Sequence, residues 1–181
     1  IISESIIGAM LYFVKAVPFS KKMQQNKKWA RVKVSRKQKS LYGSRITILG
    51  FGKIGITLGK LLKPFGCSIT GIKRKTIIAP DYFGEQDSIL TFDELKFVLP
   101  KTDHFVCILP GGEETDEIIK SEHFKMLPKS AFLYNVGRGN TYKESDLVFA
   151  LQSKEIAGAY LDVFGKEPLP ESSDFWELDN V

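Results

Sequence analysis

Residues 45–55 read Arg-Ile-Thr-Ile-Leu-Gly-Phe-Gly-Lys-Ile-Gly, a short apolar run followed by three glycines in the spacing G-x-G-x-x-G. The apolar run predicts a buried strand, and the apolar pattern from Ile54 to Phe65 predicts a helix that Pro64 and Gly66 bring to an end. A glycine triplet that follows a strand and opens a helix is typical of a turn that binds the pyrophosphate of a dinucleotide. A plain strand-to-helix turn is the alternative, and this context favours the binding turn.

Each glycine of this turn has a separate physical role in bringing an anion close to the backbone. The first permits the tight turn, the second lets the backbone approach a pyrophosphate, and the third lets the helix pack closely on the strand. The start of the helix adds free backbone N–H groups and the positive end of the helix dipole. The sequence therefore predicts cofactor contacts from Gly50, Gly52, Lys53, Ile54 and Gly55.

Short apolar runs alternate with helix-like segments along the rest of the chain. Thr91 and Glu94 form a capping box that opens a helix ending before Pro100. Near-continuous apolar strands that alternate with helices predict an α/β fold, a Rossmann-type doubly wound parallel sheet with helices on both faces. The further strands are expected at 68–72, 89–90, 104–109, 131–136 and 157–163, and the further helices at 121–126 and 143–152.

The second strand runs into a basic cluster, Lys73-Arg74-Lys75, and no carboxylate follows until Asp81. A site for NAD has an acid about 20 residues beyond the glycine turn, where it binds the ribose hydroxyls. A cationic cluster at this point instead suits the 2′-phosphate of NADP, through charge-assisted hydrogen bonds from Arg74 in particular. A solvated basic turn is the alternative. We therefore expect NADP(H) as the preferred cofactor, with NAD as the other candidate.

Three stretches, 43–55, 127–147 and 158–170, resemble the NAD(P)-binding domain of the D-isomer-specific 2-hydroxyacid dehydrogenases. The second contains Asn-Val-Gly-Arg-Gly at 135–139 and the third contains Leu-Asp-Val-Phe-Gly-Lys-Glu-Pro at 161–168. Leu109-Pro110 is similar to the glyoxylate/hydroxypyruvate reductase branch, whose members often use NADPH. The resemblance extends over essentially the whole chain and implies two domains, with nicotinamide and substrate in the cleft between them.

The resemblance also implies the roles of individual residues. Arg138 falls on the catalytic arginine, which binds the carboxylate of a small 2-oxo or 2-hydroxy acid, and an arginine suits that task because its planar fork is always charged. Glu167 falls on the glutamate that orients a catalytic histidine, whose pKa a carboxylate partner raises. Asp162 matches a residue near the nicotinamide amide. The remaining cofactor contacts implied by the match are Leu109, Pro110, Val136 and Gly137.

The sequence departs from the family pattern at the catalytic histidine. His104 starts a strand and His123 lies on a short helix, so neither matches the motif and both are expected to be structural. The chain starts at Ile1 rather than Met and stops just before the expected histidine, so we interpret it as one domain without its substrate domain. Smaller departures are Gly111-Gly112, where the family has a polar residue, and Lys143, where it often has an acid.

Charge is unevenly distributed over the 181 residues. Residues 1–45 contain eleven basic side chains and one acid, Glu4, whereas residues 46–181 are net acidic by five charges. Nucleic-acid binding is one interpretation of such a segment. Few aromatics and an amphipathic helix from Ser3 to Val17, with a second helix entered at Pro18, argue against that interpretation. The resemblance implies instead that residues 1–42 are a dimerisation arm that packs onto a partner subunit, ahead of a Rossmann core over 43–181.

Composition excludes several classes of protein. The apolar run from Ile6 to Val14 spans nine residues, less than half of the roughly 20 that cross a bilayer. Two cysteines, Cys67 and Cys107, are too few for a disulfide framework or a metal-ligand cluster. Both lie in apolar stretches of the sequence, which is typical of buried thiols in a reducing cytoplasm. We expect a cytoplasmic, homodimeric reductase of small 2-oxo acids that binds neither membrane, metal nor nucleic acid. A nucleotide-sensing regulator with the same fold remains the alternative.

Overall fold

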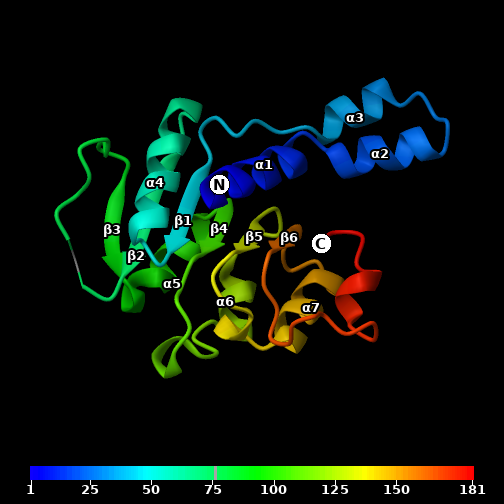
Figure 1. The fold of residues 1–181 in the computed structure, drawn as a ribbon. Helices are drawn as coiled ribbons and strands as arrows, with labels where there is room; N and C mark the ends of the chain where they lie inside the picture. Colours follow the sequence, from blue (N-terminus) through cyan, green and yellow to red (C-terminus); the bar gives the residue numbers. More distant parts are fainter. Residues whose placement is uncertain (76) are drawn as a thin grey trace.

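A computed structural model of the protein describes residues 1–75 and 77–181. Its centre is a six-stranded parallel sheet in the order β3-β2-β1-β4-β5-β6 (Figure 1). From β1 the chain moves outward to β3, then returns to the other side of β1 and adds β4 to β6, so the strand order reverses between β1 and β4. This arrangement confirms the expected Rossmann-type fold. The strands are β1 (Arg45–Leu49), β2 (Ser68–Lys73), β3 (Ser88–Thr91), β4 (His104–Cys107), β5 (Phe132–Asn135) and β6 (Gly158–Leu161).

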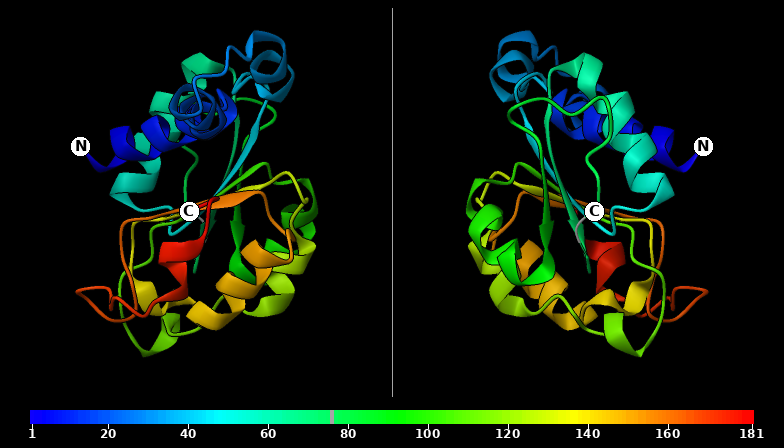
Figure 2. Two further views of the ribbon diagram at one scale, coloured as in Figure 1. Left: turned by 90° about the vertical axis from the view of Figure 1, so that its right-hand side faces the viewer. Right: turned by 90° about the vertical axis from the view of Figure 1, so that its left-hand side faces the viewer.

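Helices cover both faces of the sheet, as Figure 2 shows. On one face Ile6 and Met10 of α1 and Leu58 of α4 are buried in one apolar cluster with strand residues such as Ile48. On the other face the helices α5 to α7 close a second cluster. The α-helices are α1 (Ile2–Val14), α2 (Val17–Gln25), α3 (Arg31–Lys37), α4 (Lys53–Leu62), α5 (Leu95–Val98), α6 (Ser121–Met126) and α7 (Glu144–Gln152).

Short 3₁₀ turns form parts of two segments that the sequence predicts as helices. The helix expected to end at Phe65 is α4 followed by a 3₁₀ turn that contains Pro64, and the helix opened by the Thr91–Glu94 capping box runs as η2, α5 and η3. The strand expected over 104–109 ends at Cys107. These turns are η1 (Lys63–Phe65), η2 (Phe92–Glu94), η3 (Leu99–Lys101), η4 (Glu113–Thr115), η5 (Gly139–Thr141) and η6 (Asp174–Glu177).

The N-terminal segment differs from the arm that the sequence suggests. The expected helix from Ser3 to Val17 ends at Val14, and Ala16 takes a left-handed conformation with φ +53° before α2 begins. α1 packs against α4 and buries Ile6 and Met10, so it is part of the domain core. Only α2 and α3, in which no residue is buried, stand away from the sheet (Figure 1). The two helices without buried residues thus span 17–37, and the dimerisation role of residues 1–42 stays a prediction.

Over residues 1–75 and 77–181 no single helix is long and apolar enough to span a bilayer, and α1 with α2 reaches that length only as a pair bent by 60°.

Candidate functional site

The glycine turn lies at the carboxyl end of β1, where the strand order reverses. Gly50 has φ +94°, a conformation that favours glycine. A Cβ atom on Gly50 would lie 2.6 Å from the carbonyl oxygen of Ile108, so a larger residue would push this turn away from the loop after β4. The backbone N–H groups of Gly50 and Phe51 both donate to the carbonyl of Ile72, each at 3.1 Å. The turn is therefore anchored to β2 and to the start of the loop after β4.

The other two glycines meet opposite surroundings. A Cβ atom on Gly52 would meet no atom within 4 Å, so its backbone is open to a ligand. A Cβ atom on Gly55 would lie 3.1 Å from the Ile48 Cγ2 atom, so this glycine keeps α4 close to β1. The first N–H groups of α4, on exposed Lys53 and Ile54, have no acceptor inside the helix. An open backbone and free N–H groups at one point suit a pyrophosphate.

The basic cluster follows directly from β2, beside this turn. Arg74 is 86% exposed, and its Nη1 atom lies 2.6 Å from the Oε2 atom of Glu114, which is 75% exposed. Lys73 is half-buried and Lys75 is exposed. Glu114 belongs to η4, in the loop after β4, so this ion pair joins loops that follow two strands on either side of β1. Sequence reasoning did not identify Glu114, because forty residues separate it from Arg74.

The loops after β4 and β5 touch beside the glycine turn. A Cβ atom on Gly137 would lie 2.6 Å from the carbonyl oxygen of Leu109, so the two loops meet at van der Waals distance only because this residue is glycine. Pro110 follows Leu109 at the surface, and Val136 N–H donates to the carbonyl of Cys107 at 3.1 Å. The predicted cofactor residues of both loops therefore lie together at the edge formed by the carboxyl ends of the strands.

Arg138 is held by a buried polar network that starts at the end of β5. The Nδ2 group of Asn135 donates to the carbonyl of Arg138 at 2.9 Å and to the Tyr142 hydroxyl at 3.1 Å. Its Oδ1 atom accepts from the N–H of Gly137 at 3.1 Å. The Thr141 hydroxyl also donates to the Arg138 carbonyl, at 2.8 Å. Sequence reasoning missed Asn135, Thr141 and Tyr142 as positioning residues, although Asn135 belongs to the quoted motif.

The side chain of Arg138 points out of this anchored loop. It is exposed, and its Nη1 group donates to the carbonyl of Gly137 at 2.7 Å. A Cβ atom on Gly111 would lie 3.4 Å from the Arg138 Cγ atom, so the Gly111-Gly112 departure leaves space beside the arginine. An exposed guanidinium at this edge has donors available for a carboxylate.

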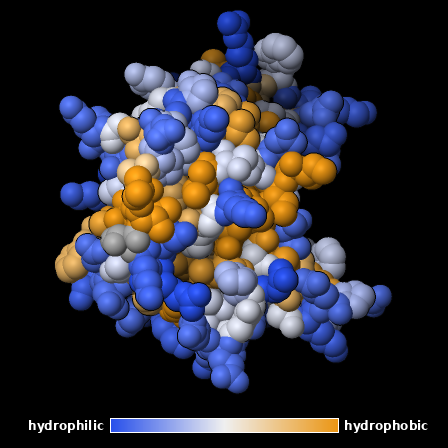
Figure 3. Space-filling view, turned by 60° about the vertical axis from the view of Figure 1, so that its left-hand side comes forward, coloured by the Kyte–Doolittle hydropathy of each residue, from blue (hydrophilic) through white to orange (hydrophobic). Residues whose placement is uncertain are grey.

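The loop after β6 completes the edge. A Cβ atom on Gly139 would lie 1.9 Å from the carbonyl carbon of Phe164, so this loop touches the one that carries Arg138. Glu167 is exposed and accepts a hydrogen bond from the Phe164 N–H at 3.0 Å, which fixes one carboxylate oxygen. The N–H of Asp162 donates to the carbonyl of Asn135 at 2.9 Å, and its side chain is exposed. Figure 3 shows apolar surface around a central hollow on the left-hand face of Figure 1.

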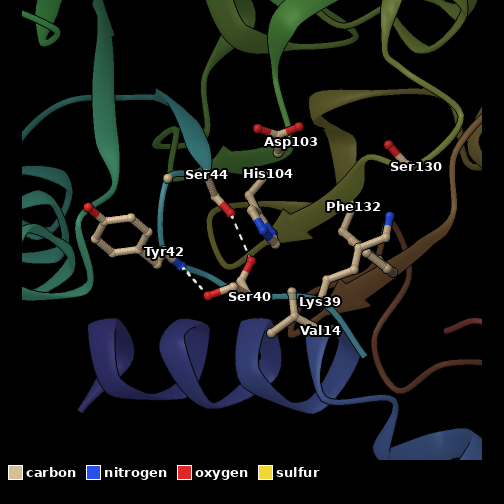
Figure 4. Close-up of a pocket in the computed structure, with 10 residues that line it drawn as sticks. Val14, Lys39, Ser40, Tyr42, Ser44, Asp103, His104, Ser130 and Phe132 are labelled. Carbon is tan, nitrogen blue, oxygen red and sulfur yellow. Dashed lines mark hydrogen bonds between the residues drawn. The ribbon is translucent and has the colours of Figure 1, made fainter. Parts of the chain in front are cut away.

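Both histidines have structural surroundings. His104 begins β4, at the opposite edge of the sheet, and its Nδ1 atom lies 2.8 Å from the hydroxyl of Tyr134. Burial lowers the pKa of His104 to about 4, with Lys39 acting in the same direction and Asp103 against it. Figure 4 shows His104 at a small pocket of this amino edge beside Ser40. His123 accepts from the Lys120 N–H at 2.9 Å and so caps α6.

The two thiols are unpaired and buried, as expected from their apolar neighbours. Burial raises the pKa of Cys67 to about 11 and that of Cys107 still further. Both are therefore neutral at physiological pH. Within residues 1–75 and 77–181, no three His, Cys, Asp or Glu side chains gather closely enough to hold a metal ion.

Similar sequences and similar solved structures both belong to one family of dehydrogenases. Residues 7–181 match the model of the D-isomer specific 2-hydroxyacid dehydrogenase, NAD binding domain. Glyoxylate/hydroxypyruvate reductase A of Salmonella heidelberg is 34% identical over 136 residues, covering 75% of this chain and 42% of that protein. The Xanthobacter autotrophicus D-isomer specific 2-hydroxyacid dehydrogenase, solved with NADPH and MES, has a TM-score of 0.87 at 29% identity and covers 99% of this chain and 54% of its own.

A third relative has the same coverage. The NADPH-dependent glyoxylate/hydroxypyruvate reductase of Sinorhizobium meliloti, solved with NADP and sulfate, has a TM-score of 0.87 at 26% identity over 99% of this chain and 55% of its own. The chain thus spans about half the length of the curated relatives that it matches.

Proposed function

Because the chain belongs to the D-isomer-specific 2-hydroxyacid dehydrogenase family, as its NAD-binding domain, we propose that the whole protein reduces a small 2-oxo acid to a D-2-hydroxy acid. Glyoxylate, hydroxypyruvate and pyruvate are the small 2-oxo acids that we propose as substrates. The observation that carries the proposal is Arg138, whose guanidinium is exposed and whose backbone carbonyl is held by Asn135 and Thr141 at the same edge as the glycine turn.

The residues of this edge divide the work of the reaction. When bound, the dinucleotide supplies the hydride. Gly50, Gly52 and Gly55 bring the backbone and the N-terminus of α4 to its pyrophosphate. Leu109, Pro110, Val136, Gly137 and Asp162 would hold its nicotinamide half.

Arg138 and Glu167 act on the substrate side. Arg138 grips the substrate carboxylate with its fork and polarises the neighbouring carbonyl. Glu167 orients a histidine supplied from outside residues 1–181, and its negative charge raises the pKa of that imidazole so that it protonates the carbonyl oxygen. The contact between the 139 and 164 backbones supports this pairing of roles, because it joins the two loops.

Of the two dinucleotides, NADP(H) and NAD(H), the basic cluster favours NADP(H). Lys73, Arg74 and Lys75 gather three cations at the end of β2, where a 2′-phosphate would add two negative charges. The relatives solved with NADPH or NADP support this choice. Titration of the whole protein with NADPH and NADH tests it, and tighter binding of NADH would overturn it.

The segment formed by α2 and α3 is the candidate surface for a second subunit. It carries exposed Trp29 and Val32 and a groove that is lined by apolar Phe19 and Met23 and by four basic side chains. A homodimer would cover this apolar surface, and its basic rim meets a body that is net acidic. Light scattering of the whole protein tests this arrangement, and a monomer at high concentration would overturn it. Two buried free thiols fit a reducing compartment such as the cytoplasm.

The substrate role of Arg138 is tested by replacing it with alanine in the whole protein. Loss of a charged partner for a bound carboxylate costs about 2–5 kcal/mol, so kcat/KM for the 2-oxo acid falls by at least about thirtyfold. Lys129→Ala, which removes an exposed cation ahead of β5 at the opposite edge of the sheet, is the control and leaves kcat/KM unchanged. Unaltered turnover of Arg138→Ala would refute the assignment.

A further inference from the structure

We infer that Glu114 is a specificity-determining residue, which weakens the binding of a 2′-phosphorylated dinucleotide by occupying Arg74. The inference rests on the proposed binding of NADP(H) at the basic cluster. It explains what Glu114 of η4 does at this edge, where the residues that end and follow β2 are the cations of the basic cluster.

The first step concerns the position of the ion pair. β2 and β4 lie on either side of β1, and the crevice outside their carboxyl ends is where dinucleotides bind in sheets of this order. Arg74 follows β2 and Glu114 lies in η4 after β4, and their Nη1 and Oε2 atoms are 2.6 Å apart. The pair therefore bridges the loops that border the crevice.

The second step concerns competition for the guanidinium. An arginine fork binds a carboxylate and a phosphate with the same N–H donors, so an incoming 2′-phosphate must displace or share Glu114. Both side chains are largely exposed, at 86% and 75%, so little packing holds Arg74 in its present direction. The carboxylate is also a negative charge next to the position of the phosphate, and it adds repulsion that salt screens.

The third step gives the size and direction of the effect. An exposed ion pair is weak, so Glu114 lowers the affinity for NADP(H) by about two- to fivefold and does not prevent binding. A dinucleotide with a free 2′-hydroxyl makes no demand on the guanidinium, and its affinity changes by less than about twofold. The basic cluster Lys73–Lys75 makes the affinity for NADP(H) higher than the affinity for NAD(H). Glu114 reduces this difference in affinity.

Calorimetric titration of the whole protein with 2′,5′-ADP, 5′-AMP, NADPH and NADH tests the inference, because the first two probes isolate the 2′-phosphate. Glu114→Gln is compared with Glu113→Gln, which removes a neighbouring exposed charge. The expected result is that Glu114→Gln tightens the binding of 2′,5′-ADP and NADPH by about two- to fivefold at low salt, and that the affinities for 5′-AMP and NADH stay within about twofold. Glu113→Gln changes all four by less than about twofold.

The outcomes separate this inference from the proposed function. If the unaltered protein binds the phosphorylated probes and Arg74→Ala weakens them, but Glu114→Gln leaves them unchanged or weaker, the role of Glu114 is overturned and the cofactor proposal stands. If the unaltered protein binds none of the four probes, or prefers NADH and is insensitive to Arg74→Ala, both are overturned. Equal tightening by Glu113→Gln and Glu114→Gln would also overturn the role, since it would reduce the effect to net charge.

Discussion

Replacing Asn135 with alanine removes the side chain that joins β5 to the loop carrying Arg138. Asn135 is fully buried, and its amide makes three hydrogen bonds, to the Arg138 carbonyl, the Tyr142 hydroxyl and the Gly137 N–H. At about 1 kcal/mol for each neutral bond, with the Thr141 hydroxyl still satisfying the carbonyl, the free energy of unfolding falls by about 2–4 kcal/mol.

The variant also changes the function of Arg138 through its backbone. A loop without these bonds leaves the guanidinium less often in the orientation that binds a carboxylate, so KM for the 2-oxo acid rises by about tenfold or more. Nucleotide affinity changes less, because the glycine turn is anchored separately to Ile72.

Urea unfolding and steady-state kinetics of the whole protein measure the two effects together. Asn140→Ala, at an exposed position in the same segment, is the control and shifts stability by less than about 0.5 kcal/mol. The reasoning fails if Asn135→Ala is as stable as Asn140→Ala, or if it unfolds more easily while KM for the 2-oxo acid stays unchanged.

Three further changes test the fold that carries this edge. Gly139→Ala places a Cβ atom 1.9 Å from the Phe164 backbone and lowers the free energy of unfolding by about 2 kcal/mol or more in urea. Burial lowers the pKa of His104 to about 4, so the folded state resists a proton that the unfolded state binds near pH 6.5. The free energy of unfolding therefore decreases as the pH is lowered from about 6.5 to about 4. His104→Gln lacks this decrease when urea unfolding is measured across that pH range. Burial alone would raise the pKa of Asp87, but the hydrogen bond from Lys63, at 2.7 Å, and two backbone N–H groups outweigh it and lower the pKa. The ionised Asp87 therefore contributes to the free energy of unfolding fully above about pH 4, and the contribution is lost as the pH falls through the folded pKa. In acid unfolding, Asp87→Asn lacks this contribution.

Most of the fold was predictable from residues 45–163, because each buried parallel strand is a continuous apolar run and each connection is short. The N-terminal helices α1 to α3 were less predictable from the sequence. α3 has no apolar period that marks a helix among its lysines and arginines, and the break at Ala16 depends on a left-handed backbone that its sequence does not demand. The burial of α1 follows from its packing on α4, which lies some forty residues further along the chain.

The candidate site was predictable where its chemistry is local. The glycine turn has a spacing that follows from its geometry, and the Arg138 motif was identifiable from the family resemblance. The ion pair of Arg74 with Glu114 and the network around Asn135 depend on which loops the sheet brings together, so neither could be read from spacing along the chain. These are the residues that adjust the site rather than define it.

The most direct test of the central proposal is the oxidation of NADPH by the whole protein in the presence of glyoxylate, hydroxypyruvate or pyruvate. We expect loss of NADPH absorbance that depends on the 2-oxo acid, formation of the D-2-hydroxy acid, and a strong decrease in rate for Arg138→Ala. Tight binding of NADPH without turnover of any 2-oxo acid would contradict the account and would favour a nucleotide-sensing regulator of the same fold.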